Sequence, residues 1–383
     1  MIRLQRAILL AAYYASAFAP PGTPEHALAS WVKEEGGFIG DVAVETRDCV
    51  RGLYATKDVQ KGTLLLSVPE ACCIAADEDP QWGLSLRELT TARLVGSLSR
   101  GERKVYTDVL PKDVPLLVDW SDAELAELQS PRLAEVARGM APFLDESVAR
   151  VLPFVQGTEA DVRWAERMVR SRALLFDDGG FNSLGDLDSP AMMALVPLVD
   201  LANHRTPDLG EVEPVSVDYA AKAITLAAPR DLSEGDQVTI CYRYEGNEKL
   251  LLDYGFAEAL EGQPCYEEIN LGESDGEELI LDSTLADTCA LDDLGATRFR
   301  ELLQASLAAP TTLTEDRAML SESTTLEEGY GLLRAESVRL FHALTYRIGQ
   351  KALMTKMLEA LESDDPAGAL ETIRLPPGDL YKL

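Results

Sequence analysis

The stretch LVPLVDLANH, from Leu195 to His204, is an apolar run that ends in an acid, an amide and an imidazole. Asp200, Asn203 and His204 differ in hydrogen-bonding capacity: a carboxylate only accepts, an amide donates and accepts, and a neutral imidazole does one of each. Polar side chains at the end of a hydrophobic segment need partners within the fold or a ligand. His204 could therefore be an ordinary buried histidine or part of a binding site.

The chain offers little for a metal site. Histidine occurs only at positions 26, 204 and 342, and the six cysteines are scattered apart from the adjacent Cys72 and Cys73. None of them has the spacing of zinc ligands. We therefore expect no structural metal, and we interpret the thiols as reduced packing residues of an intracellular compartment.

The composition indicates a globular protein with an acidic surface. Its 383 residues, 46% of them hydrophobic, suffice for two or three domains with a sizeable core. The 65 acidic residues exceed the 35 basic ones, which gives a formal charge of -30. Such a field repels phosphate backbones and anionic lipid heads, so we expect neither nucleic-acid binding nor stable membrane association. We interpret the acidity as serving solubility, with an acidic dock for a basic partner as the alternative.

The amino terminus has the order of a targeting sequence. Two arginines, an apolar stretch from Ala7 to Ala15 and then small residues are typical of a signal peptide, and the stretch is too short for a stop-transfer helix. A buried first helix is the alternative. The segment ASAFAP, Ala15 to Pro20, resembles the junction signal of plastid proteins in algae with red-lineage secondary plastids. That resemblance implies cleavage before Phe18, a presequence of residues 1–20 and a location in the chloroplast stroma.

Around the central stretch the pattern alternates between strands and helices. Residues 26–40 read as a short amphipathic helix closed by glycines, and Leu53–Thr56 and Thr63–Val68 read as two strands of a hairpin. Helical spacing then fills an insertion over about 81–167. Short strands return in four segments: Ala194–Leu201, Val212–Val217, Ala223–Ala227 and Gln237–Tyr242. A helix is expected at Glu248–Leu252, and from about Pro264 the chain reads as helical to its end, most clearly over Leu326–Leu361.

Five segments in this order resemble the SET-domain protein methyltransferases, and more narrowly the subfamily of the plant Rubisco large-subunit lysine methyltransferase. They are RGLYATKDVQKGTLLLSVPE, VRSRALLF, LVPLVDLANH, DLSEGDQVTICY and NEKLLLDYGF, from residues 51, 169, 195, 231 and 247. The resemblance implies an α+β fold: a SET domain at residues 25–258 with the helical insertion, then an all-α substrate-binding domain at 264–375.

The resemblance also implies a binding site for S-adenosylmethionine. Gly52 and Leu53 match the glycine-leucine turn near the cofactor, where a residue without Cβ permits close approach, although a plain hairpin glycine is the alternative. Asn203 and His204 match the pair that holds the adenine. Phe256, in the segment DYGF, matches an aromatic residue of the cofactor pocket and lysine channel.

Catalytic and substrate-binding positions follow in the same way. Tyr242 matches the catalytic tyrosine, and Tyr254 matches an aromatic residue of the lysine channel. Arg170, Ser171 and Asp200 match positions on the substrate-lysine side, with a surface ion pair as the alternative for Arg170. A phenol of pKa about 10 is a poor base at neutral pH, so we expect Tyr242 to act by positioning and electrostatics.

The chain departs from the family at three places. Where relatives often have an acid before the glycine-leucine turn, it has Asp48 and Cys49, either of which could substitute. After His204, Tyr219 is the only tyrosine offered for the substrate site. The cysteine cluster of many histone-directed members is missing, which argues against a zinc-dependent histone enzyme.

The function that the resemblance implies is S-adenosylmethionine-dependent methylation of a lysine on a plastid protein. Rubisco large subunit and fructose-bisphosphate aldolase are the candidate substrates, and we expect the enzyme to be a monomer. Two alternatives remain: histidine methylation by the same fold, and a binding module that keeps the fold without turnover.

Overall fold

The computed structural model describes residues 18–47, 50–77, 81–176, 191–207, 210–242, 246–259, 269–274, 277–281, 300–301, 303–308, 310–330, 335–366 and 368–369. The chain divides into two compact units. The first unit comprises residues 1–114 and 144–242, and the second comprises residues 115–143 and 243–383. This division differs from the expected boundaries in placing residues 115–143 with the carboxyl-terminal part.

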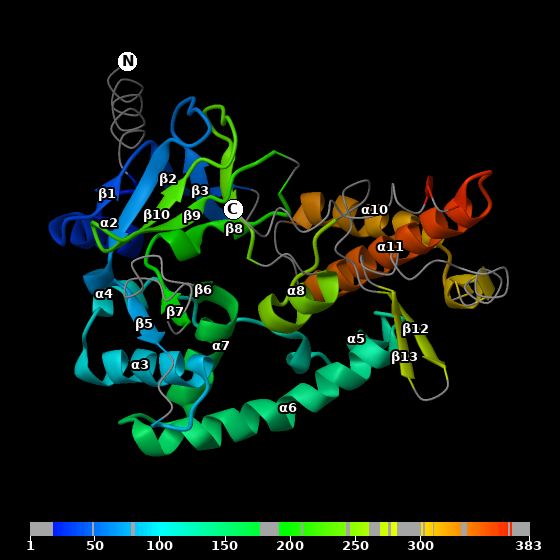
Figure 1. Cartoon of the computed structure of the whole chain (residues 1–383), viewed down its shortest axis with the longest axis horizontal. Coiled ribbons are helices and arrows are strands. Elements are labelled where there is room, and N and C mark those ends of the chain that lie inside the picture. The colour runs from blue at the N-terminus through cyan, green and yellow to red at the C-terminus, as the bar shows by residue number, and fades with distance from the viewer. Residues whose placement is uncertain are drawn as a thin grey trace. The chain divides into compact units, whose positions relative to one another are not determined.

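The first unit holds three small sheets of short strands (Figure 1). Their strand orders are β1-β4-β10-β9, β2-β3-β11-β8 and β5-β7-β6. The strands are β1 (Phe38–Ile39), β2 (Val42–Arg47), β3 (Val50–Ala55), β4 (Leu64–Pro69), β5 (Ile74–Asp77), β6 (Leu174–Phe176), β7 (Met192–Leu195), β8 (Asn203–His204), β9 (Val215–Asp218), β10 (Ala223–Ala227) and β11 (Gln237–Ile240).

The expected hairpin between residues 53–56 and 63–68 is wrong in its pairing. Both strands exist, but β3 pairs with β2 and β11, whereas β4 pairs with β1 and β10. The connection between β3 and β4 is hydrogen-bonded to the segment that follows β10. The Lys61 backbone N–H donates to the Asp231 carboxylate, and the Gly62 N–H donates to the Ala228 carbonyl. These bonds direct β4 into a different sheet.

The stretch from Ala194 to Leu201 is also not one strand. β7 ends at Leu195, a 3-10 turn covers Val199–Leu201, and β8 starts at Asn203. Pro197 has no N–H for a sheet ladder, and Leu198 has a φ of 69°, a conformation that costs energy in a residue other than glycine. The break turns Asp200 away from the strand that carries Asn203.

Helices cover the sheets of the first unit: α2 (Pro24–Glu34), α3 (Leu86–Arg100), α4 (Lys104–Thr107) and α7 (Glu159–Arg172). Their starts agree with local sequence. Ser85 and Glu88 form a capping box at α3, and Thr158 and Asp161 form one at α7, so that free N–H groups of each first turn are bonded. Helices occupy much of the region expected as a helical insertion, and the division between the units falls within its longest helix, α6 (Pro131–Val151).

The second unit is mainly helical, with α5 (Asp122–Ala126), α8 (Asn247–Tyr254), α10 (Leu313–Tyr330) and α11 (Ala335–Leu361). The expectation of an all-α region after residue 264 is wrong in one place, because β12 (Ile269–Ser274) and β13 (Glu277–Leu281) pair as an antiparallel hairpin. The sequence Asp275-Gly276 between them is a strong hairpin signal.

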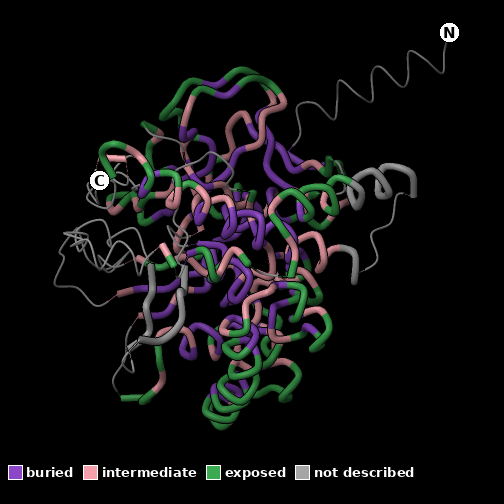
Figure 2. The backbone as a smooth tube through the Cα atoms, turned by 90° about the vertical axis from the view of Figure 1, so that its right-hand side faces the viewer, coloured by how far each residue is buried: buried purple, intermediate pink, exposed green. Residues whose placement is uncertain are grey.

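Both units contain buried hydrophobic residues, and Figure 2 draws the buried residues in purple. In the second unit a hydrophobic cluster joins Leu117, Trp120 and Leu128 to Leu251 and Tyr346. Asp316 of α10 is fully buried and forms ion pairs with Arg347 and Lys351 of α11 at 2.8 and 2.7 Å. Among the described residues no helix is long and apolar enough to cross a membrane.

Candidate active site

The sheet β2-β3-β11-β8 brings together three segments that are far apart in the sequence. β3 pairs antiparallel with β11, so that Leu53 lies opposite Val238. β11 pairs in parallel with β8, which sets Thr239 beside Asn203 and Ile240 beside His204. Gly52, Asn203, His204 and the end of β11 therefore belong to one neighbourhood in the first unit.

Gly52 lies where two side-chain amides approach the backbone of β3. An ideal Cβ on Gly52 would lie 2.8 Å from the Asn203 Nδ2 and closer still to the Gln237 Nε2. Gly52 does not have a positive φ, so the close approach, rather than a turn, requires glycine here. The Asn203 Nδ2 donates to the Arg51 carbonyl at 3.0 Å, which ties β8 to β3. Leu53 is fully buried, so its side chain belongs to the core.

Gln237 was not singled out in the sequence, where it is simply the first residue of a strand. Its Nε2 is buried and has no hydrogen-bond partner among the described residues. A buried amide donor left without an acceptor costs about 1–3 kcal/mol. This cost indicates that Gln237 is available to a ligand at the place where Gly52 and Asn203 meet.

His204 and Tyr242 form a small hydrogen-bonded unit. The Tyr242 backbone N–H donates to the His204 Nδ1 at 3.0 Å, and the Tyr242 hydroxyl donates to the Ala202 carbonyl at 2.8 Å. Their ring centroids are 5.3 Å apart. Because the Nδ1 accepts a hydrogen bond, it carries no proton, and in this geometry the imidazole proton is on the Nε2. The two bonds fix both rings relative to β8.

Asp200 is held in a buried polar cluster that the sequence did not predict. Its Oδ2 accepts from the Tyr106 hydroxyl at 2.6 Å, and its backbone carbonyl accepts from the Arg172 guanidinium at 2.7 Å. Burial raises the pKa of Asp200, and Arg172 opposes that shift. Burial also raises the pKa of Tyr106 well above its usual value, and the Asp200 charge adds to this effect. The Tyr106 phenol therefore stays protonated and serves as donor.

Arg170 and Ser171 both have partners on their own helix, α7. The Arg170 guanidinium donates to the Glu166 carboxylate at 2.7 Å, and both side chains are almost completely buried. The alternative of a surface ion pair is therefore wrong, because the pair lies inside the unit. The Ser171 hydroxyl donates to the Arg167 carbonyl at 2.8 Å.

Tyr254 and Phe256 belong to the second unit. Tyr254 is the last residue of α8, and its ring centroid is 6.3 Å from that of Phe256. Phe256 in turn packs edge to face with His342 of α11 at 6.5 Å. Burial lowers the pKa of His342 to about 4, and its Nδ1 accepts from the Ala257 N–H at 3.2 Å. Aromatic side chains therefore pack on one another around this turn of chain.

The three departures from the family pattern have different outcomes. Asp48 and Cys49 lie outside the described residues. Tyr219 directly follows β9 and is half-buried, in a sheet that does not contain β3 or β8. In the described part of the chain, no group of three or more histidine, cysteine, aspartate or glutamate side chains is placed to hold a metal ion.

The chain matches the SET domain family over residues 50–243. It is 27% identical over 274 residues to the ribulose-1,5-bisphosphate carboxylase/oxygenase large subunit N-methyltransferase, chloroplastic, of Pisum sativum, covering 64% of this chain and 54% of that protein. It is 25% identical to the chloroplastic [fructose-bisphosphate aldolase]-lysine N-methyltransferase of Arabidopsis thaliana, over 60% of this chain and 51% of that protein. The chain thus spans about half the length of the curated relatives it matches.

Solved structures show the same fold. The crystal structure of the SET domain of LSMT bound to lysine and AdoHcy matches with a TM-score of 0.62 at 22% identity, over 89% of this chain and 92% of that one. The structure of Rubisco LSMT bound to AdoMet matches with a TM-score of 0.60 at 21% identity, over 94% of this chain and 99% of that one. With half of its residues matched to one family and the fold shared with solved members, this chain belongs to the SET-domain family.

Proposed function

We propose that this protein is an S-adenosylmethionine-dependent protein-lysine N-methyltransferase of the plastid. The observation that carries the proposal is the junction of three segments, at residues 51–53, 202–204 and 237–242, which is tied by the bonds from Asn203 to Arg51 and from Tyr242 to Ala202. The described residues at this junction offer amide donors and a fixed imidazole and phenol.

The residues at the junction fit a ligand with a purine edge. The orphaned Gln237 Nε2 can donate to a ring nitrogen, and the Asn203 amide keeps an oxygen that can accept from an exocyclic amine. The absence of a Cβ at Gly52 leaves room for both amides. We propose that Asn203, His204 and Gln237, with the backbone at Gly52 and Leu53, hold the cofactor. By the resemblance, we also propose a cofactor-binding role for Phe256.

S-adenosylmethionine supplies a methyl group on a positively charged sulfur, and an uncharged amine must attack it in line. Tyr242 suits the positioning role in this reaction. Because its proton is donated to the Ala202 carbonyl, its remaining lone pair can face an electropositive methyl group or accept from an amine N–H. The bond to the Ala202 carbonyl holds the phenol in place, and the bond from the Tyr242 backbone N–H to the His204 Nδ1 holds the backbone at the same residue. A phenol fixed in this way stabilises developing charge without reorganising.

The substrate lysine must lose its charge before it reacts. Burial beside aromatic and apolar side chains lowers the pKa of an amine, because the charged form is desolvated. By the resemblance we propose a lysine-binding role for Tyr254, and separately a substrate-side role for Asp200, Arg170 and Ser171 of the first unit. Since Asp200 and Arg170 are engaged by Tyr106 and Glu166, we propose that they act by holding the backbone rather than by contacting the lysine.

The relatives support a protein substrate. The named activities of the Pisum sativum and Arabidopsis thaliana proteins concern Rubisco large subunit and fructose-bisphosphate aldolase, both in the chloroplast. A third relative, 24% identical over 59% of both chains, is the ribosomal lysine N-methyltransferase set11 of Schizosaccharomyces pombe. We propose that the substrate of this chain is a plastid protein. Rubisco large subunit and fructose-bisphosphate aldolase are the first candidates.

The test of activity is methylation of a stromal extract with cofactor labelled in its methyl group. We expect labelled protein, and acid hydrolysis of the product should give methyl-lysine. Methyl-histidine would instead assign the chain to histidine methylation. If the folded protein bound S-adenosylmethionine and labelled nothing in the extract, the binding-module alternative would replace the proposal.

The plastid location is testable apart from activity. Of the predicted presequence, residues 1–20, the first 17 lie outside the described residues, but Phe18 is 6% exposed and its carbonyl accepts from the Val44 N–H. Changing Phe18 in the whole protein would therefore disturb the fold as well as targeting. A fluorescent fusion that carries only the first 60 or so residues avoids this. We expect plastid fluorescence, arrest outside the stroma with Phe18→Ala, and cytosolic fluorescence only if the targeting hypothesis is wrong.

A further inference from the structure

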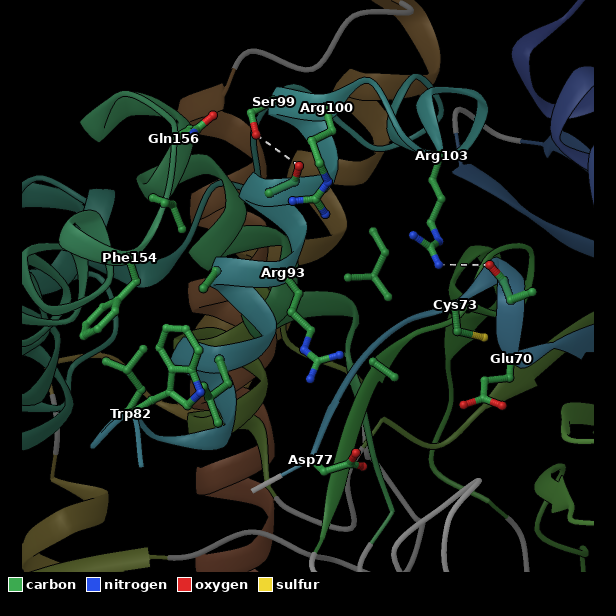
Figure 3. A pocket seen from close by; sticks show the side chains of 18 residues that line it. Glu70, Cys73, Asp77, Trp82, Arg93, Ser99, Arg100, Arg103, Phe154 and Gln156 are labelled. Carbon is green, nitrogen blue, oxygen red and sulfur yellow. Dashed lines mark hydrogen bonds between the residues drawn. The ribbon is translucent and has the colours of Figure 1, made fainter. Parts of the chain in front are cut away.

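The first unit has a second hollow, and none of its lining residues belongs to the candidate active site. α3, β5, the turn Glu70–Cys72 and the turn Leu152–Phe154 enclose a cleft of about 940 Å³ (Figure 3). Ligand pockets in proteins commonly have volumes of about 300–1,000 Å³. This cleft is therefore large enough for several residues of a peptide or for a small molecule.

An arginine without a partner extends into this cleft. Arg93, on α3, is exposed, and Figure 3 shows its guanidinium in the middle of the hollow. Across the described residues, no ion pair or hydrogen bond joins its side chain to Asp77 or to any other group. A guanidinium carries five donors and keeps its charge at every physiological pH. Arg93 is thus a free cation on a chain whose formal charge is -30.

The other charged groups of the cleft are largely engaged. Arg100 is bound by Glu102 through two bonds of 2.9 and 3.0 Å. Arg103 donates to the Ala71 carbonyl at 3.0 Å, but its buried Nε has no partner among the described residues. Glu70 and Asp77 also line the walls. The cleft can therefore accept one negative charge of a ligand at Arg93, with help from Arg103. The carboxylates of Glu70 and Asp77 would repel a ligand that carries several negative charges.

Two aromatic side chains form the opposite end of the cleft. Trp82 and Phe154 are 49% and 47% exposed, and their rings meet edge to face at 5.3 Å. Large aromatic side chains that stay in solvent together commonly mark an interaction surface. The aromatic pair therefore offers an apolar platform.

We propose that this cleft binds an extended segment of a protein partner in which one acidic side chain accompanies one aromatic or large apolar side chain. The carboxylate pairs with the two-pronged guanidinium of Arg93, a geometry that arginine favours. The apolar side chain packs on Trp82 and Phe154. Glu70 and Asp77 accept backbone N–H groups of the bound segment.

The charge pattern favours a carboxylate over a phosphate or a nucleotide. A phosphate group brings nearly two negative charges, and a nucleoside triphosphate brings more, close to Glu70 and Asp77. Arg100 cannot offset that charge without releasing Glu102. A single carboxylate needs only Arg93. The binding of a peptide here does not depend on methyl transfer, so the proposal can be tested without cofactor or turnover.

The probe is a set of blocked peptides that carry one glutamate and one phenylalanine separated by one to four glycine or serine residues. The chain has four tryptophans, so ¹⁵N labelling of the indoles gives four signals, and Trp82→Phe identifies the one in the cleft. We expect at least one peptide spacing to shift the Trp82 signal in a saturable way and to leave the other three unchanged. Replacing glutamate by glutamine in that peptide should weaken binding about tenfold, as loss of one charge-assisted pair does.

Arg93→Gln should weaken binding of the glutamate peptide by the same factor, and it should not weaken the glutamine peptide further. Arg163→Gln is the matched control, because Arg163 is an exposed arginine paired with Glu159 and Asp145 and does not line the cleft. Phe154→Ala should weaken both peptides equally. No shift at millimolar peptide, equal binding by the Arg93→Gln protein, or tighter binding of inorganic phosphate or ATP at the Trp82 signal would overturn the proposal.

Discussion

Asn203 is the residue at which a structural and a functional role can be separated most sharply. Its Nδ2 already donates to the Arg51 carbonyl at 3.0 Å, so Asn203→Ala removes that bond whatever else the amide does. A net hydrogen bond contributes about 0.5–1.5 kcal/mol, and we expect the free energy of unfolding to fall by that amount. If the amide also holds the adenine, its loss leaves polar atoms of a buried purine unpaired. That adds about 1–3 kcal/mol to the cost of binding, or about a 5- to 150-fold higher Kd.

Calorimetric titration with S-adenosylmethionine, alongside urea unfolding, measures both quantities on the same protein. Gln129→Ala is the matched control, because Gln129 is an amide in the second unit that bonds Thr311 and Lys351. It should lower stability by a similar amount and leave the Kd unchanged. Gln237→Ala, which removes the orphaned donor, should raise the Kd without lowering stability. If Asn203→Ala lowered stability while the Kd stayed at its original value, the amide would be purely structural and our reasoning would be refuted.

Three further predictions address catalysis, pH dependence and the second unit. Tyr242→Phe should lower kcat about 100-fold or more, as removal of one preorganised polar group does, while the Kd for S-adenosylmethionine changes little. Tyr254→Phe should alter the degree of methylation or lysine binding more than the chemical step, and a methyl-transfer assay that found the larger kcat loss at Tyr254 would reverse the two assignments. Burial lowers the pKa of His342 from 6.5 to about 4, so between these values the unfolded chain binds a proton that the folded protein does not. The free energy of unfolding should therefore fall by about 3 kcal/mol as the pH drops through this window. The glutamine of His342→Gln can still accept a hydrogen bond from the Ala257 N–H. In urea titrations at several pH values, this variant should lack the part of the pH dependence that comes from His342. Asp316→Asn leaves Arg347 and Lys351 buried without their anion and should cost about 3–5 kcal/mol. Glu359→Gln, on the exposed side of α11, should cost almost nothing in the same denaturation measurement.

Local sequence predicted the elements better than it predicted their partners. The capping residues Ser85 and Thr158 start α3 and α7, and Gly36, with a φ of 92°, follows α2 where a glycine stop was expected. The pairing of β3 with β2 and β11, rather than with β4, depends on bonds between residues about 170 positions apart, such as Lys61 to Asp231. Spacing along the chain carries no information about such bonds.

The candidate site shows the same contrast. A family pattern led to Asn203, His204 and Tyr242, which the structure brings together in the first unit. Gln237 and Tyr106 were missed because each is an ordinary residue of a strand or helix, and only the fold brings them to Gly52 and Asp200. Arg170 was given a surface alternative because arginine is usually exposed. Its burial with Glu166 follows from packing of α7, which the sequence does not display.

The most direct test of the central claim is mass spectrometry of proteins incubated with the purified chain and S-adenosylmethionine. Stromal protein from cells that lack the enzyme is the substrate, and the Tyr242→Phe protein is the control. We predict lysine residues that gain mass in steps of one methyl group with the unmutated chain and gain far less with the variant. A folded chain that binds S-adenosylmethionine but leaves every lysine unmodified, or one whose Tyr242→Phe variant methylates at the full rate, would contradict the account.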